Sequence, residues 1–182
     1  MKNYFKKMRG TSRTHTRQPL SHIFWSWAGS FAGIFSVWKI NYFLGIQENA
    51  NLFLVGSFGA SAVLVYGVPM SDFSQPRNFV GGHIISAATG VAVCMIVPDH
   101  VALAAALAVS IAVAAMLISH TTHPPGGATA LIAVIGGEPI TSMGFRYVFA
   151  PVLTGVLIML LVALLVNNLS ASEGRHYPKF WV

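Results

Sequence analysis

The sequence predicts an all-α integral membrane protein built from two repeats, each a long helix, a short re-entrant or broken helix and a second long helix. Composition is the first observation behind this prediction. Only 9% of the 182 residues are charged and 54% are hydrophobic, whereas soluble domains carry about 25% charged residues. The other two observations are the lengths of the apolar segments and a similarity between two of them. In water a chain this apolar would leave much of its surface uncovered, so we expect it in a membrane.

A basic arm precedes the first apolar segment. It contains no acid, and its bases supply most of the net charge of +6: Lys2, Lys6, Lys7, Arg9, Arg13 and Arg17. Basic residues beside a first span keep that side in the cytoplasm and attract anionic lipid. We therefore divide the chain into a cytoplasmic arm (1–21), a transmembrane domain (22–170) and a cytoplasmic interfacial tail (171–182). Nucleic-acid binding by the arm is the alternative, and we expect membrane lipid as the partner instead.

The apolar segments have two lengths. A helix needs about 20 apolar residues to cross a bilayer, and four segments reach that length, at about 22–45, 78–97, 101–119 and 145–168. Two shorter apolar segments lie between them, at about 52–68 and 126–137. We therefore predict four long and two short transmembrane helices. Cys94 is the only cysteine, so no disulfide can form within the chain.

The two short segments resemble each other. Residues 59–65 read Gly-Ala-Ser-Ala-Val-Leu-Val, and residues 127–133 read Gly-Ala-Thr-Ala-Leu-Ile-Ala. Each run ends in glycine and proline, and an arginine follows, Arg77 in one half and Arg146 in the other. Two topologies fit this repeat. If the short segments re-enter, the chain crosses four times and the repeats are parallel; if they cross, it crosses six times and the repeats are inverted.

The starts of the short helices are the predicted binding site. Short or Gly/Pro-interrupted segments in corresponding halves indicate the binding site of a transporter. Proline suits a first helical turn, glycine admits a ligand close to the backbone, and the free N–H groups of a helix start favour an anion. A tight turn needed only for packing is the alternative. The predicted substrate-binding residues are Ser57, Gly59, Ala60, Ser61, Gly126, Gly127, Ala128 and Thr129.

A second set of residues is predicted to shape or gate the site: Arg77, Asn78, His83, His120, His123, Pro124 and Pro125. The spacing of His120 and His123 would suit zinc on a helix, but no nearby acid or cysteine completes a site, so we expect no metal. The histidines either hydrogen-bond the broken backbone or help an anion or a proton through. Arg77 either snorkels to the headgroups or has a functional or structural role, and the polar run 75–78 favours the second.

The missing residue types narrow the function. No Asp or Glu lies inside a predicted span, although cation pumps and proton relays usually need buried carboxylates. The path should therefore suit an anion or a neutral solute. Nothing in the chain matches a nucleotide-binding loop or a nucleophile elbow, so we expect neither an enzyme nor a cofactor.

These motifs resemble a known family. His123-Pro124-Pro125, followed by the Gly-Gly-Ala-Thr-Ala-Leu run of 126–131, is similar to the signature of the HPP family of integral membrane proteins. The resemblance extends to residues 59–62, to Gln75-Pro76-Arg77-Asn78 and to the tail 177–181. It implies four transmembrane helices and a bacterial inner membrane or an organellar membrane. Because cyanobacterial and chloroplast members are associated with nitrite transport, it also implies a small monovalent anion as the substrate.

Three hypotheses for the function follow. The first is transport of a nitrite-type anion, passive or coupled to protons, at a site between the starts of the short helices. The second is a channel for a neutral small solute or ammonia. The third is a membrane scaffold or sensor that transports nothing and binds a partner through its arm. Faces rich in small residues, such as 81–82 and 87–88, permit close helix packing, and we expect a homo-oligomer of unspecified size.

Overall fold

The structure is a computed structural model that describes residues 17–43, 56–171 and 175–182. Within them it is all-helical, without a strand, which confirms the predicted class. The α-helices are α2 (Leu20–Phe43), α3 (Gly56–Ala62), α4 (Pro76–Ile96), α5 (Val101–Ile118), α6 (Pro125–Ile135), α7 (Glu138–Thr141) and α8 (Thr154–Leu169). Two π-helical segments, η2 (Val63–Gly67) and η4 (Val148–Leu153), continue α3 and precede α8, and a 3₁₀ turn, η3 (Asp72–Ser74), precedes α4.

Three segments among the described residues are long and apolar enough to cross a membrane: Pro76–Ile96, Val101–Ile118 and Val148–Leu169. They coincide with three of the four predicted long segments. The remaining one, predicted at 22–45, forms the 24-residue helix α2, which has the length to cross but is less apolar than these three. Its serines, His22 and Lys39 lower its hydropathy, and its tryptophans favour the membrane interface over the hydrocarbon.

Both predicted short segments contain a helix. Residues 52–68 contain α3 and η2, which together make one apolar helical stretch from Gly56 to Gly67, and residues 126–137 contain α6. Residues 52–55 and residues 1–16 of the predicted arm lie outside the described residues.

Small residues bring α4 and α6 together. Gly82, Ser86 and Gly90 recur every four residues along α4, which places them on one face. A Cβ atom added to Gly82 would lie 2.6 Å from the Cβ of His123, and one added to Gly90 would lie 2.5 Å from the carbonyl oxygen of Ala130. Such contacts let the two backbones approach closely, as small residues do in membrane proteins. Since the contacts advance together along both chains, α4 and α6 run in the same direction.

Helix α5 covers the other side of this pair. Its buried residues, Ala104, Ala108, Ala112 and Met116, again recur every four residues. The alanines face α4 and α6, and most of the remaining surface of α5 is exposed. This distribution is the one expected of a helix that packs through a small-residue stripe and turns its large apolar side chains to lipid.

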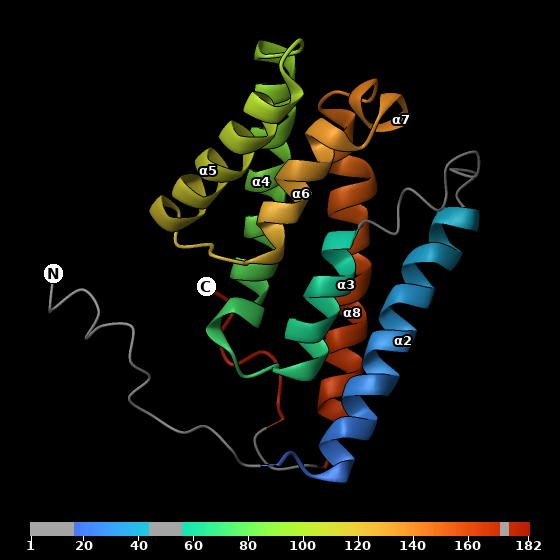
Figure 1. The fold of residues 1–182 in the computed structure, drawn as a ribbon. Coiled ribbons are helices and arrows are strands. Elements are labelled where there is room, and N and C mark those ends of the chain that lie inside the picture. The colour runs from blue at the N-terminus through green and yellow to red at the C-terminus, as the bar shows by residue number, and fades with distance from the viewer. Residues whose placement is uncertain (1–16, 44–55, 172–174) are drawn as a thin grey trace, which may run out of the picture.

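Helix α8 is the centre of a second group. It packs against α2 and lies along α3 and η2. A Cβ atom added to Gly155 would lie 2.5 Å from the ring of Phe58, and Asn167 Nδ2 donates to the Val65 carbonyl at 3.1 Å. The chain from α3 through η2 therefore runs in the same direction as α8. As a result α3 and α6 point in opposite directions and begin near each other in the middle of the bundle (Figure 1).

The C-terminal tail is joined to this second group through a buried arginine. Arg175 is 1% exposed and donates to His22 O at 3.1 Å, Ser26 Oγ at 3.0 Å, Tyr66 O at 2.7 Å and Asn167 Oδ1 at 3.2 Å. Burial lowers the pKa of its guanidinium, although arginine stays charged in proteins. The segment predicted as an interfacial tail is thus docked against α2, η2 and α8.

Candidate functional site

Four buried polar side chains meet where α3, α4 and α6 converge, and we call them the polar cluster: Ser61, His83, His123 and Thr129. All four are 0% exposed. Ser61 Oγ lies 2.8 Å from His83 Nε2 and 2.9 Å from His123 Nε2. His83 Nδ1 lies 2.7 Å from Thr129 Oγ1, and His123 Nδ1 lies 2.7 Å from the carbonyl oxygen of Phe73. Ser61 and Thr129, which occupy matching positions in the two short segments, therefore both contact His83.

Aromatic rings enclose the cluster. Phe58 and Phe79 meet His83 edge-on, with ring centroids 5.7 Å and 5.5 Å away, and Phe79 lies 5.1 Å from His123. The two imidazoles are themselves 4.9 Å apart. Because these walls are apolar, the cluster lies in surroundings of low dielectric, where hydrogen bonds are stronger and unpaired polar groups are costly.

Two further serines near the cluster lack a partner for their hydroxyl groups among the described residues. Ser57 and Ser86 are 0% exposed, and the Oγ atom of each has no hydrogen-bond partner. Ser57 lies one turn before Ser61 on the same face of α3, and Ser86 lies beside Gly126 at the start of α6. Since buried hydroxyls are usually paired, these two mark the places where a polar ligand would find a free donor.

The predicted substrate-binding residues divide into two sets. Ser57, Ser61 and Thr129 are buried at or beside the cluster, whereas Gly59 and Ala60 are exposed on the other side of α3. At the start of α6, Gly126 is buried, and Gly127 and Ala128 are half-buried.

The backbone at the start of α6 already uses two of its donors. Gly126 N donates to His123 O at 2.8 Å, and Gly127 N donates to Pro124 O at 3.1 Å. Pro125, the first residue of the helix, has no N–H group. A ligand here would therefore meet side-chain donors more readily than the backbone N–H groups that the sequence indicated.

Two of the predicted gating residues hold the segment that carries His123. Arg77 Nη2 donates to Ser119 O at 3.2 Å, and Asn78 Nδ2 donates to Thr122 O at 2.9 Å. Arg77 itself is exposed. Both residues lie in the first turn of α4, so they fasten the start of that helix to residues 119–122, directly before His123.

Three other predicted gating residues lie outside the polar cluster: His120, Pro124 and Pro125. His120 is exposed and has a φ of 54°, a left-handed conformation in the turn that follows α5. Pro124 is exposed, and Pro125 is buried as the first residue of α6. Of the two histidines in this motif, only His123 joins the polar cluster.

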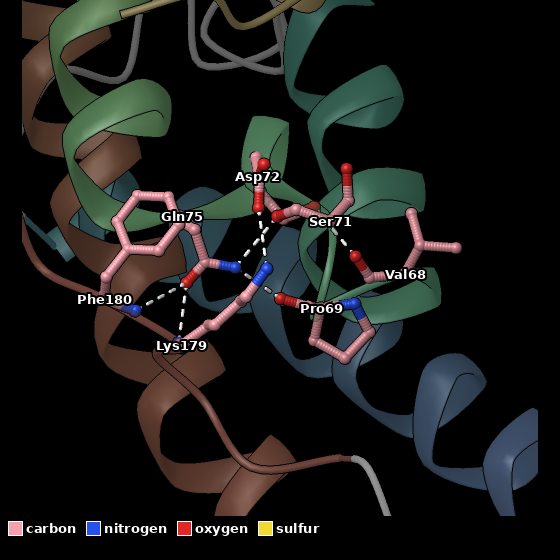
Figure 2. A network of polar contacts seen from close by, with 8 residues as sticks. Val68, Pro69, Ser71, Asp72, Gln75, Lys179 and Phe180 are labelled. Atoms are coloured by element: carbon pink, nitrogen blue, oxygen red, sulfur yellow. Dashed lines mark hydrogen bonds and ion pairs between the residues drawn. The ribbon is translucent and has the colours of Figure 1, made fainter.

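Gln75 is a central residue that the prediction of the site left out. Its side chain is 0% exposed, and all four of its hydrogen-bonding positions are used (Figure 2). Nε2 donates to Pro69 O and Ser71 O, each at 2.8 Å, while Oε1 accepts from Lys179 N at 2.7 Å and from Phe180 N at 3.5 Å. The motif Gln75-Pro76-Arg77-Asn78 carried the signal, because a polar run between two apolar segments needs partners.

The tail makes further contacts with residues 72–75, and we call this region of contact the junction around Gln75. Lys179 Nζ pairs with Asp72 Oδ1 at 3.0 Å at the surface, and Tyr177 Oη donates to Ser74 O at 2.8 Å. Burial raises the pKa of the Tyr177 phenol, so it remains a donor. Residues 72–75 are therefore held from the tail side, and Phe73, inside this run, presents its carbonyl to His123 on the other side.

No metal cluster is present in the described part of the chain, where no three His, Cys, Asp or Glu side chains come together. A cavity of about 140 Å³ lies elsewhere, between the C-terminal half of α4 and the end of α6. Its lining is mostly apolar: Val91, Cys94, Met95, Ala133, Ile140, Thr141 and Gly144. The chemistry of the described residues is therefore concentrated in the polar cluster, which offers neutral hydroxyl and imidazole groups.

Comparison with known proteins places this domain. The family model described as "HPP, transmembrane region" matches residues 15–178. Two proteins of Dictyostelium discoideum, each described as a transmembrane protein, are 46% identical over 181 residues and 44% identical over 184 residues. Each alignment covers 98% of this chain, but only 57% of the first relative and 63% of the second. The chain thus spans less than two thirds of these relatives, and no solved structure matches it.

Proposed function

The chain belongs to the HPP family of transmembrane proteins, and from that membership we propose that it carries a small monovalent anion, nitrite in the first instance, across a membrane. The observation that carries the proposal is the polar cluster between α3 and α6. It is buried, it lies between two short helices that point in opposite directions, and it consists of neutral hydrogen-bonding groups. Interrupted helices that meet inside a bundle are the usual location of a transporter's binding site.

The charges of the described residues support an anion over a cation. Arg175 is the only buried charged side chain among them, and no buried acid accompanies it. A metal cation or ammonium ion would need carboxylate or carbonyl ligands in place of its hydration shell. An anion needs donors, and the buried Ser57 hydroxyl is unpaired, while the Ser61 and Thr129 hydroxyls reach the same cluster from both short helices.

The helix directions favour inverted repeats for this transporter. Helices α2, α3 and α4 alternate in direction, and so do α5, α6 and α8 in the opposite sense (Figure 1). Each short helix then continues the alternation instead of turning back, which corresponds to the six-crossing solution. In this arrangement α4 packs against the helices of the second repeat and α8 against those of the first, so the site would form between the repeats.

Nitrite uptake into proteoliposomes tests the proposal. We expect the purified full chain to carry nitrite faster than protein-free liposomes at neutral pH, and a monovalent anion competitor to slow the uptake. Thr129→Val removes one hydroxyl from the cluster and keeps the β-branched shape. If that hydroxyl binds the anion, its loss should lower uptake about tenfold, the effect of one hydrogen bond of about 1.4 kcal/mol.

Ser110→Ala is the matched control, because Ser110 is an exposed hydroxyl on α5 that bonds only Leu107 O in its own helix, at 3.1 Å. It should retain wild-type uptake. Uptake equal to that of empty liposomes would contradict nitrite transport. Equal uptake by wild type and Thr129→Val would remove the cluster from the substrate path.

A neutral small solute such as ammonia is the second candidate, and one observation favours it. The cluster carries no fixed charge, and Phe58 and Phe79 line it, so a neutral molecule would cross it without a counter-charge. The two functions differ in their response to competing anions. Solute flux that is insensitive to anion competitors would favour the neutral channel over the anion transporter.

A further inference from the structure

The hydrogen atoms of the polar cluster can be placed from its geometry, beginning at Phe73. A backbone carbonyl only accepts, so the 2.7 Å contact requires a proton on His123 Nδ1. In a neutral His123 the other nitrogen, Nε2, must then accept. Its one partner is Ser61 Oγ at 2.9 Å. Ser61 therefore donates to His123 whenever His123 is neutral.

The rest of the chain follows from this first step. Because the single hydrogen of Ser61 is engaged with His123, the 2.8 Å contact with His83 requires His83 Nε2 to donate to Ser61 Oγ. A neutral His83 then accepts at Nδ1 from the Thr129 hydroxyl at 2.7 Å. The four hydrogen bonds all point the same way, from Thr129 through His83, Ser61 and His123 to Phe73. The two histidines must therefore be opposite tautomers.

Ser61 has a second acceptor within reach, and this makes the chain switchable. Its Oγ also lies 2.9 Å from the Ser57 carbonyl. When His123 gains a proton, its Nε2 donates to Ser61 Oγ, and the Ser61 hydroxyl turns to Ser57 O. Ser61 then accepts from both imidazoles. Every group stays paired in either state, so an added proton breaks no hydrogen bond.

We propose that the polar cluster is a proton relay in which Ser61 passes a proton between His83 and His123. In the transfer step a protonated His83 releases its Nε2 hydrogen to Ser61 Oγ, while the original Ser61 hydrogen moves to His123 Nε2. One N–H bond breaks at His83, one forms at His123, and one O–H bond is replaced at Ser61. The positive charge has then moved from α4 to the segment before α6, with no change in the number of protons or electrons.

Few groups around the polar cluster could compete with its histidines for a proton. From α3 and α4 the cluster is faced by Phe58, Phe79 and the uncharged Ser57. From the segment before α8, Tyr147 approaches it, and its hydroxyl donates to Thr129 O at 3.2 Å. Arg175, the sole buried charge in the described residues, bonds to α2, η2 and α8 instead.

A protonated imidazole in such surroundings is costly unless an anion accompanies it. The relay therefore implies that one proton and one monovalent anion move together, with Ser57 as a free donor for the anion beside Ser61. This coupling rests on the proposed anion transport, whereas the relay itself does not.

The tautomers test the relay without transport. In wild-type protein labelled with ¹⁵N-histidine, solid-state NMR should show His123 protonated at Nδ1 and His83 protonated at Nε2. The signals are assigned by their loss in His123→Gln and His83→Gln. Finding both histidines protonated at Nε2, or both at Nδ1, would overturn the relay even if nitrite transport is demonstrated.

Proton flux tests the transfer step in proteoliposomes of the full chain that contain a pH-sensitive dye and are driven by a pH gradient in the presence of nitrite, because the movement of one proton with one anion carries no net charge. Ser61→Ala should lower proton flux at least tenfold, Ser61→Thr should restore most of it, and Ser110→Ala should leave it unchanged. Equal flux in wild type and Ser61→Ala would contradict the relay. Nitrite uptake without proton movement would contradict the coupling but leave nitrite transport standing, and proton flux without nitrite uptake would contradict the proposed substrate but support the relay.

Discussion

The junction around Gln75 offers a direct test of how the tail contributes to stability. Gln75→Leu keeps a side chain of similar size in a fully buried position but removes every hydrogen bond of the amide. Three of these bonds are short, at 2.8, 2.8 and 2.7 Å, and the fourth, from Phe180 N at 3.5 Å, is weak. At about 1 kcal/mol for each good bond, we expect a loss of about 2–3 kcal/mol.

The loss of stability depends on whether the hydrogen-bond partners of Gln75 keep another partner in the variant. Ser71 O also accepts from Ser74 N at 3.0 Å, so it stays paired in the variant. Pro69 O and Lys179 N have no other partner in the described residues and would be left unpaired. The effect should therefore be concentrated on the attachment of the tail, with a smaller effect on residues 69–75.

Hydrogen exchange and thermal unfolding in detergent measure the two effects. In Gln75→Leu the peptide 175–182 should exchange faster than in wild type, and the unfolding midpoint should fall by several degrees. Gln18→Leu is the matched control, because Gln18 is exposed. If Gln75→Leu behaves like Gln18→Leu in both measurements, the junction does not hold the tail and the reasoning from its hydrogen bonds is refuted.

Two further predictions concern packing and the buried arginine. Gly82→Ala places a Cβ atom 2.6 Å from His123 Cβ and 2.8 Å from Thr121 O, so α4 and α6 must separate; we expect a loss of about 1–3 kcal/mol in thermal unfolding. Gly127→Ala, whose new Cβ would have its nearest neighbour 3.9 Å away, should leave the unfolding midpoint unchanged. Equal unfolding midpoints for Gly82→Ala and Gly127→Ala would contradict the prediction. Arg175→Lys should destabilise the tail by about 2 kcal/mol, measured as faster exchange of residues 175–182, because one ammonium cannot serve four acceptors on three elements.

Several features were predictable because local sequence determines them. The all-α class follows from apolar segments of the right length, and glycine and proline mark where the short segments break. The correspondence between Ser61 and Thr129 was also predictable, since both occupy the same position of a repeated Gly-Ala-Ser/Thr-Ala motif.

Other features depend on contacts that are remote in sequence. Arg175 looked like an interfacial base, yet its acceptors lie in α2 and η2, more than 100 positions earlier. His120 and His123 were equivalent by residue type, but the turn after α5 leaves His120 exposed and buries His123. Which of two nearby histidines turns inward depends on the direction of the backbone at that turn, and residue spacing carries no information about it.

The way the two short helices meet bears on how any ligand would be held. The sequence indicated backbone N–H groups together with the Ser61 and Thr129 hydroxyls. The N–H groups of Gly126 and Gly127 donate to carbonyls of their own turn, while the Ser57 hydroxyl is buried and unpaired. An imidazole or hydroxyl can reverse its role between donor and acceptor, whereas a backbone N–H cannot. A site built from reversible groups can bind an anion with a proton and then return to its starting pattern of hydrogen bonds without either. That property would let the same cluster both accept and release its substrate, which a fixed array of backbone donors would not do as readily.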